Sequence, residues 1–554
     1  MIVRLVLGIA KFPALIFVLA VTGLPLFVVI ALLAMGSYAE LGWDLRDMFN
    51  DIDELADKGH LLPIPLFTFA GFLLARSKAP ERLVRLADAL LGSLPGGLAI
   101  VSICACTFFT TFTGASGVTI IALGGLLYPV LKQRKYPEQF SLGLLTSAGS
   151  LGLLFFPALP VFIFAVVYGF TTESSDVTPE GLFLAGLLPG ILLTLVLCAW
   201  AWFKGVQYGI ERTKFCWKEL WDAFRAAIFE ALLPVILVGS ILSGVATLNE
   251  VATLTCVYLI IVEMVIHREI HPTRDLPKLA ADAMVLVGAI VLIMAMIMPT
   301  KDVLADQEVP QKILAWFGQF IDSRIGFLIA LNIFLLVVGC LMDIFSAIVA
   351  VLPLLIPLAQ EYDVEPLHLG VIFLTNLEIG YLTPPVGINL FISSFQFKKP
   401  VLSVYKSVIP FIALMFGTLL IITYVPALST ALPHSYIETT FPSLQEYIDS
   451  NQLSYEEEQE LSDEEFIRRA LGESGEDTEG DLNPDTWSEG DDGDLMPDSP
   501  GLEDESGDLM PDDPSIEDES GDLMPDDPSI EDDSGDLMPD NPSIEDESGD
   551  LIPD

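Results

Sequence analysis

The residues best suited to chemistry are small polar and helix-breaking residues inside long apolar runs. Thr383-Pro384-Pro385-Val386-Gly387 interrupts the apolar run 367–395, and Thr113-Gly114-Ala115-Ser116-Gly117 interrupts the run 97–131. Gly and Pro break a helix and free backbone carbonyls, which together with Ser, Thr and Asn oxygens suit a hard cation such as sodium. Helix N-termini beside such breaks present N–H groups that suit a carboxylate. These segments therefore predict ion and carboxylate binding.

The two interruptions belong to an internal repeat with a constant offset along the chain. Pro129 and Pro157 correspond to Pro357 and Pro385, and Gly152 to Gly380. The intervening loop is basic in the first copy (132–135) and acidic in the second (360–363), so the copies are predicted to be inverted. Inverted repeats with interrupted helices are typical of secondary transporters, whose sites form near the membrane midplane. A lone Pro or Gly would merely kink or tighten a helix, but the matched pair favours a site.

Two carboxylates lie inside apolar runs, where a charge is costly and therefore informative. Asp343 and Glu378 could each line the ion site, carry a proton or cap a broken helix. Glu250 differs, because its spacing from Thr247 fits a capping box at a helix start.

The elements that must position these residues are membrane helices. The chain has 74 acids against 27 bases, yet 52% of it is hydrophobic and its mean hydropathy is +0.57. Residues 435–554 hold 43 acids and two bases, whereas residues 1–434 hold the other 31 acids and 25 bases. The body is thus nearly neutral and apolar, which disfavours a nucleic-acid binder and a soluble globular enzyme. Apolar runs occur at 13–33, 61–74, 97–131, 142–168, 181–203, 226–248, 251–266, 283–298, 325–358, 367–395 and 408–428.

These runs predict an all-α polytopic membrane protein with re-entrant hairpins and broken helices. The repeats are expected at about 97–203 and 325–428 within a membrane domain of residues 1–434. Basic loops at 132–135, 204–218, 267–278 and 398–406 are expected in the cytoplasm, which puts the N-terminus inside and the tail outside. Residues 76–91 predict an amphipathic interfacial helix.

The tail is expected to be disordered. Residues 435–470 form an acidic linker that could be helical, and residues 471–554 carry an acidic repeat of period 14. Two interpretations of this tail remain open. It is either a solvated appendage or a segment that binds calcium or a cationic partner weakly. No segment matches an EF-hand loop.

Cysteine and histidine spacing gives little support for metal or disulfide chemistry. No Cys-x-x-Cys pair occurs, and five of the six cysteines lie in apolar stretches. His267 and His271 share a metal-like spacing, but a basic loop at the membrane face explains them better than zinc.

The chain resembles the large permease subunit of the tripartite ATP-independent periplasmic (TRAP) transporters over nearly all of residues 1–434. The resemblance rests on residues 64–71, on Leu94-Pro95-Gly96-Gly97 and above all on residues 376–390. It implies an elevator-type transporter of the bacterial inner membrane that couples sodium to uptake of an organic acid, C4-dicarboxylate-like or another carboxylate. It also implies a small membrane subunit, a periplasmic binding protein, no cofactor and no enzyme activity.

The resemblance also assigns site residues. The hairpin around Thr113, Gly114, Ser116 and Gly117 and the one around Asp343 would flank the substrate path. The loops would complete the sodium sites. The loop residues are Gly152, Pro157, Thr383, Pro384, Pro385 and Gly387. Two further candidates for substrate or ion binding are Asn376 and Asn389, on either side of the second loop.

One departure concerns the first copy, where the family usually has Pro-Pro-Ser and this chain has Phe156-Pro157-Ala158. A side-chain ligand at Ala158 is therefore absent, and the sodium stoichiometry could differ. Two other hypotheses stay open: a self-sufficient carboxylate or ion symporter or antiporter of the same fold, and a membrane enzyme or tail-presenting anchor.

Overall fold

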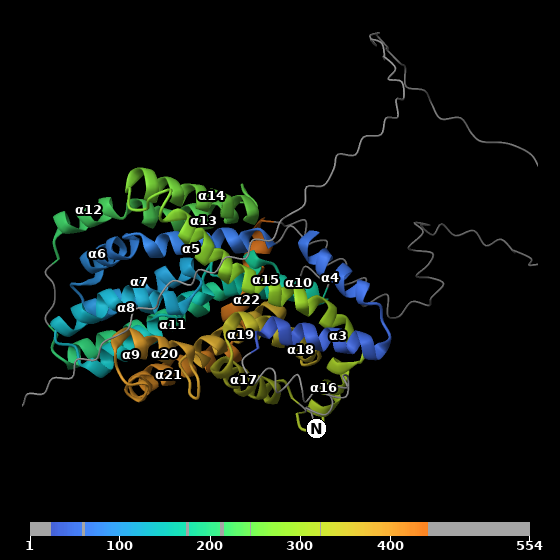
Figure 1. Cartoon of the computed structure of the whole chain (residues 1–554). Coiled ribbons are helices and arrows are strands. Elements are labelled where there is room, and N and C mark those ends of the chain that lie inside the picture. The colour runs from blue at the N-terminus through green and yellow to red at the C-terminus, as the bar shows by residue number, and fades with distance from the viewer. Residues whose placement is uncertain are drawn as a thin grey trace, which may run out of the picture. The chain divides into compact units, whose positions relative to one another are not determined.

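The computed structural model describes residues 24–57, 61–172, 177–210, 215–243, 245–321 and 323–440. Every regular element in these ranges is a helix (Figure 1), which confirms the predicted all-α class. Six helices are long and apolar enough to cross a membrane, and two bent pairs would raise the number to eight. The six are Pro179–Gln207 (α11), Leu248–Ile266 (α14 with η3), Leu276–Asp306 (α15), Arg324–Leu341 (α17), Ile344–Glu361 (α18) and Val401–Tyr424 (α21).

The two predicted repeats have the same order of elements. Helix Ser116–Gln133 (α8) corresponds to α18 at both of its ends with the offset seen in the sequence, and the next helices begin at Glu138 and Pro366 with that same offset. The other elements of the first copy are α7 (Gly97–Thr113), α9 (Glu138–Ala148), the 3-10 helix η2 (Leu151–Leu154), α10 (Leu159–Thr172) and α11. Those of the second copy are α17, α19 (Pro366–Gly380), α20 (Ile388–Phe397) and α21.

The long apolar runs break where small polar residues and glycines predicted interruptions. Gly114 ends α7 with φ +61°, and Gly387 precedes α20 with φ +55°, a left-handed conformation that glycine adopts without a Cβ clash. In the second hairpin Asp343 starts α18 as its N-cap, where its side chain accepts a hydrogen bond from the Ser346 N–H. Each copy therefore contains a hairpin and an interrupted helix.

In each copy, one arm of the hairpin packs against a helix of the other copy. The second arm of the first hairpin, α8, packs on α20 of the second copy (Figure 1). The corresponding arm α18 packs on α10 of the first copy. Small residues allow the α8–α20 approach, since a Cβ added at Gly117 would lie 2.6 Å from Ile392 and one at Gly124 would lie 2.9 Å from Phe397. Such reciprocity is the packing expected of two copies related by a pseudo-two-fold axis.

The remaining helices flank the repeats in sequence. The capping box predicted from Thr247 and Glu250 is confirmed, because the Thr247 side chain accepts from the Glu250 N–H and the Glu250 side chain accepts from the Thr247 N–H. These helices are α3 (Leu26–Leu41), α4 (Leu45–Asp57), α5 (Pro63–Arg76), α6 (Ala79–Leu91), α12 (Trp217–Ala226), α13 (Ile228–Leu242), α14 (Leu248–Ile260), the π-helix η3 (Ile261–Ile266), α15, α16 (Val309–Phe317) and α22 (Ala427–Thr440).

The predicted first residue of the helix over residues 76–91 is wrong. Arg76 belongs to the last turn of α5, Ser77 is extended, and α6 begins only at Ala79. Pro80 occupies the first turn of α6, where its missing N–H costs nothing, but it could not continue a helix arriving from α5.

The predicted boundary at residue 434 falls inside α22, which continues to Thr440. Residues 441–470 of the predicted linker and the whole repeat tail 471–554 lie outside the described residues, as do residues 13–23 of the first apolar run.

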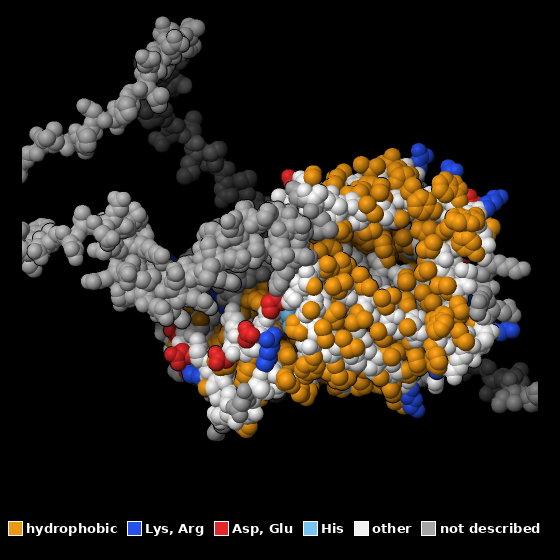
Figure 2. All heavy atoms as spheres, turned by 180° about the vertical axis from the view of Figure 1, so that it is seen from behind, with side chains coloured by type: hydrophobic (Ala, Val, Ile, Leu, Met, Phe, Trp, Pro, Cys, Tyr) orange, Lys and Arg blue, Asp and Glu red, His pale blue; other side chains and the backbone are white. Residues whose placement is uncertain are grey.

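The body presents an apolar surface, as a membrane-spanning protein should. Figure 2 shows hydrophobic side chains over most of the described face, with Lys and Arg side chains near its margins. Large apolar side chains point outward from several membrane-length helices, for example Leu195 (59% exposed), Val285 (74%) and Ile333 (61%). A soluble protein rarely shows so much contiguous apolar surface.

Helix α17 crosses α19 through two glycines, which gives a test of the packing. A Cβ added at Gly380 would lie 2.6 Å from the backbone Cα and C of Gly339, so Gly380→Ala must push the helices apart. We expect a loss of about 1–3 kcal/mol, seen as a lower unfolding temperature of the detergent-solubilised protein. The matched control is Gly417→Ala in α21, where nothing lies within 4 Å of the new Cβ. Equal unfolding temperatures for Gly380→Ala and the parent would contradict this packing.

Candidate functional site

The tip of the first hairpin gathers threonine hydroxyls around backbone carbonyls. Thr110 Oγ1 lies 2.7 Å from Thr119 Oγ1 and donates to the carbonyl of Gly149 at 2.9 Å. Thr113 Oγ1 has three oxygens at 3.5 Å: the carbonyls of Thr110 and Ala115 and the hydroxyl of Thr119. This is longer than a normal O–H···O bond of about 2.7–2.8 Å. The groups are all neutral oxygens, which suit a hard cation.

The interrupted helix of the first copy lies directly against this tip. A Cβ at Gly152 would be 2.3 Å from the Thr107 carbonyl oxygen and 2.5 Å from the Thr111 nitrogen, so only glycine fits there. The Thr111 hydroxyl lies 3.3 Å from the carbonyl of Gly152. Gly152 is therefore brought against the last turns of α7, which ends at Thr113 and Gly114. Pro157 follows in the same loop, after a cis peptide bond from Phe156.

The second hairpin tip is closed by a carboxylate. Besides the Ser346 N–H, which donates to Asp343 Oδ2 at 3.0 Å, the Ser346 hydroxyl bonds to Asp343 Oδ1. The hydroxyl of Tyr381 accepts a hydrogen bond from the N–H of Ile344, the first residue of α18. Of the three roles left open for Asp343, the structure displays the helix cap.

The loop between α19 and α20 contacts this second tip through its backbone. The Gly387 N–H donates to the carbonyl of Cys340 at 3.2 Å, while the Thr383 hydroxyl turns back to the carbonyl of Ile379 at 2.9 Å. Pro384 and Pro385 are joined by a cis peptide bond, and both are exposed. The Gly387 contact places this loop, which also carries Thr383, Pro384 and Pro385, beside the second hairpin.

The two copies meet at two helix N-termini. Ser116, the first residue of α8, donates from its hydroxyl to Asn389 Oδ1 at 2.8 Å, and Asn389 lies in the first turn of α20. Both side chains are buried, and the Asn389 Nδ2 donor has no hydrogen-bond partner among the described residues. Gly117 lies next to this contact, against Ile392. Two positive helix ends with a free amide donor between them suit a carboxylate.

Two further polar residues, both on α19, are buried. Asn376 donates to Asn332 Oδ1 and to the carbonyl of Ile372, both at 2.8 Å, and so ties α19 to α17. Neither hairpin tip supplies one of its hydrogen-bond partners in the described part of the chain. Glu378 is fully buried, and neither of its carboxylate oxygens has a hydrogen-bond partner there.

Sequence reasoning placed Thr119 in the first hairpin region but missed Thr110 and the carbonyl of Gly149. A signal was present, because Thr107, Thr110, Thr111 and Thr113 recur on a short stretch of an otherwise apolar helix. The zinc interpretation of His267 and His271 gains no support, because no group of three or more His, Cys, Asp or Glu that could hold a metal occurs in the described residues.

The chain is similar to known transport proteins along most of its length. Residues 12–428 match the family model of the tripartite ATP-independent periplasmic transporter, DctM component. The chain is 33% identical over 397 residues to the C4-dicarboxylate TRAP transporter large permease protein of Pseudomonas aeruginosa, covering 70% of this chain and 90% of that protein. It is 32% identical over 422 residues to the isethionate TRAP transporter permease protein of Oleidesulfovibrio alaskensis, covering 74% of this chain and 64% of that protein.

The fold has a solved counterpart. The YdaH transporter of Alcanivorax borkumensis aligns with a TM-score of 0.53 at 14% identity, covering 72% of this chain and 97% of that structure, which shows the likeness of fold alone.

The match over residues 12–428 and the membrane-length helices identify a multi-pass inner-membrane protein of a transport family rather than an enzyme family. The chain belongs to the large permease (DctM) component family of the tripartite ATP-independent periplasmic transporters.

Proposed function

We propose that the chain is the large membrane subunit of a sodium-coupled secondary transporter that imports an organic acid delivered by a periplasmic binding protein. The observation that carries the proposal is the Thr113 hydroxyl with three oxygens around it at 3.5 Å. Hydroxyls and freed carbonyls at broken helices are the ligands by which membrane transporters hold sodium. In this proposal Thr113, Thr110 and Thr119 hold the coupling sodium together with the carbonyl of Gly149.

The substrate carboxylate is proposed to bind between Ser116 and Asn389. The N-termini of α8 and α20 meet there, and the unpartnered Asn389 Nδ2 supplies a donor. The N-terminus of α18 is unsuitable for an anion because Asp343 already caps it with a negative charge. This difference assigns the carboxylate to one helix junction rather than to both hairpin tips.

The relatives support an anionic substrate. Their names specify a C4-dicarboxylate in one case and isethionate in another, and both are small organic anions. We propose a C4-dicarboxylate-like acid or another carboxylate for this chain, with a small membrane subunit as the second partner. At the first interrupted helix Phe156 and Ala158 offer no side-chain oxygen, so any ion held there would use backbone carbonyls.

The packing suggests how the site would move. Ser116 bonds to Asn389 and Thr146 bonds to Ser393, both at 2.8 Å, so the first-copy helices α8 and α9 are joined to α20 of the second copy. We propose that these parts move as one body and carry the ion and the substrate across the membrane, as an elevator mechanism requires.

The sodium proposal is tested by Thr113→Val, which removes a hydroxyl at nearly constant volume. Loss of one ligand to a charged ion costs about 1.5–3 kcal/mol, so the sodium concentration for half-maximal uptake should rise at least about tenfold. The measurement is sodium-dependent uptake into proteoliposomes. Thr375→Val is the matched control, because among the described residues that buried hydroxyl bonds only to the carbonyl of Val371. An unchanged sodium dependence in Thr113→Val would contradict the assignment.

The carboxylate proposal is tested by Asn389→Asp, which replaces the free amide donor with a negative charge of similar size. We expect transport to fall by at least about tenfold through repulsion of the substrate anion, with the protein still folded. Ser393→Ala is the comparison, since it removes the neighbouring bond between the copies with Thr146 but adds no charge at the helix ends, so uptake should fall less than in Asn389→Asp. Substrate uptake by Asn389→Asp at the parent's rate would overturn this site.

The function as a whole is tested by reconstituting the chain with a small membrane subunit and a periplasmic binding protein. Uptake of an organic acid should require all three proteins and an inward sodium gradient. Robust uptake by the chain alone would instead support the alternative, a self-sufficient carboxylate symporter or antiporter of the same fold.

A further inference from the structure

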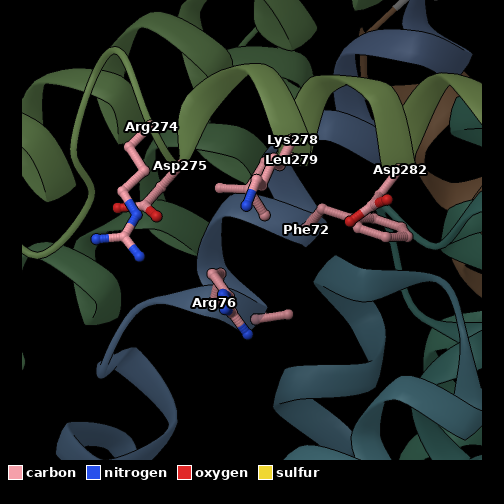
Figure 3. A pocket seen from close by; sticks show the side chains of 8 residues that line it. Phe72, Arg76, Arg274, Asp275, Lys278, Leu279 and Asp282 are labelled. Carbon is pink, nitrogen blue, oxygen red and sulfur yellow. The ribbon is translucent and has the colours of Figure 1, made fainter. Parts of the chain in front are cut away.

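A pocket outside the transport site lies where α5 ends and α15 begins (Figure 3). Its volume is about 330 Å³. Figure 3 shows Arg274 and Lys278 extending from one wall and Arg76 lying across from them. The lining residues are Phe72, Ala75, Arg76, Arg274, Asp275, Lys278, Leu279 and Asp282.

The charges around this pocket favour an anion. Arg76, Arg274 and Lys278 form no salt bridge with any described residue, so three cations share one cavity without a protein counter-ion in direct contact. Asp275 is already engaged, since its Oδ2 accepts from the His271 N–H at 3.0 Å. The pocket is lined by these three cations and by two carboxylates, Asp275 and Asp282, so the net charge of its lining is positive by one.

The loop that carries Arg274 is held in place by a buried ion cluster. Arg82 donates to Glu269 Oε1 and Glu230 Oε1, both at 2.7 Å, and to Glu263 Oε1 at 3.1 Å. The side chains of Glu230 and Glu263 are fully buried, and that of Arg82 is 12% exposed. These bonds connect α6 to α13, η3 and the loop, so one wall of the pocket is fixed in advance of any ligand.

The surroundings of the pocket are amphiphilic. Phe72 and Leu279 line it, and α15 continues beyond it with the outward-facing apolar side chains of Val285 and Leu292. The basic loop 267–278 lies on the side that the charge rule assigns to the cytoplasm, whose leaflet carries anionic lipids.

We propose that this pocket binds the phosphate headgroup of an anionic phospholipid, with the acyl chains lying on the apolar surface of α15. Arginine and lysine around a concave site match a phosphate in charge and donor geometry. A free phosphate ester would offer the same head chemistry but would leave the apolar surface of α15 unused.

The test is lipid binding to the full chain in detergent, measured by native mass spectrometry with phosphatidylglycerol, phosphatidylcholine or glycerol phosphate as probe. Each cation near an anionic lipid contributes about a fivefold gain in affinity, so R76Q with K278Q should weaken phosphatidylglycerol binding roughly 25-fold. The control is K132Q with K406Q, which also removes two exposed positive charges but leaves the pocket intact. It should keep the parent's affinity.

A variant that binds the lipid more tightly than the parent provides a second test, because misfolding cannot cause tighter binding. D282N removes a negative charge from the pocket and should tighten phosphatidylglycerol binding about fivefold, with phosphatidylcholine binding unchanged. Equal phosphatidylglycerol affinity of R76Q/K278Q and the K132Q/K406Q control would overturn the proposal. Glycerol phosphate binding as tightly as the lipid would also overturn it, because the site would then serve a soluble phosphate.

Discussion

A broken helix inside a membrane must have its freed backbone groups covered by protein, because hydrocarbon offers no hydrogen bonds. The first copy meets this constraint with side chains: the hydroxyls of Thr110 and Thr111 face the carbonyls of Gly149 and Gly152. The second copy meets it with backbone, as the Gly387 N–H donates to the carbonyl of Cys340. Hairpin tips and interrupted helices must therefore lie against each other, which concentrates polar groups in an apolar body.

The two copies share an architecture but differ in charge at one corresponding position. Asp343 caps α18, whereas Ala115, its counterpart in the first copy, leaves the start of α8 without a side-chain cap. One helix N-terminus is thus neutralised within the chain, and the other meets α20 at Asn389 with a donor to spare. This asymmetry is the reason that the proposed carboxylate site lies at the α8 N-terminus and not at the α18 N-terminus, which Asp343 already caps.

The helical class, the hairpins and the constant offset between the copies could be predicted from sequence, because Gly, Pro and charge patterns act locally. The Thr247 and Glu250 capping box is local too, and it is confirmed. The Ser116–Asn389 bond could not be predicted, since it joins residues far apart in the sequence whose contact depends on how the copies pack. Asn376 stays a prediction: its Nδ2 donates to Asn332, while its buried Oδ1 has no hydrogen-bond partner among the described residues.

The central claim is that the threonine-lined tip of the first hairpin holds the coupling cation. The most direct measurement is a crystal structure of the full chain with thallium in place of sodium, examined by anomalous scattering. We expect a peak enclosed by Thr110, Thr113, Thr119 and the carbonyl of Gly149. Thallium peaks confined to other parts of the protein would contradict the claim.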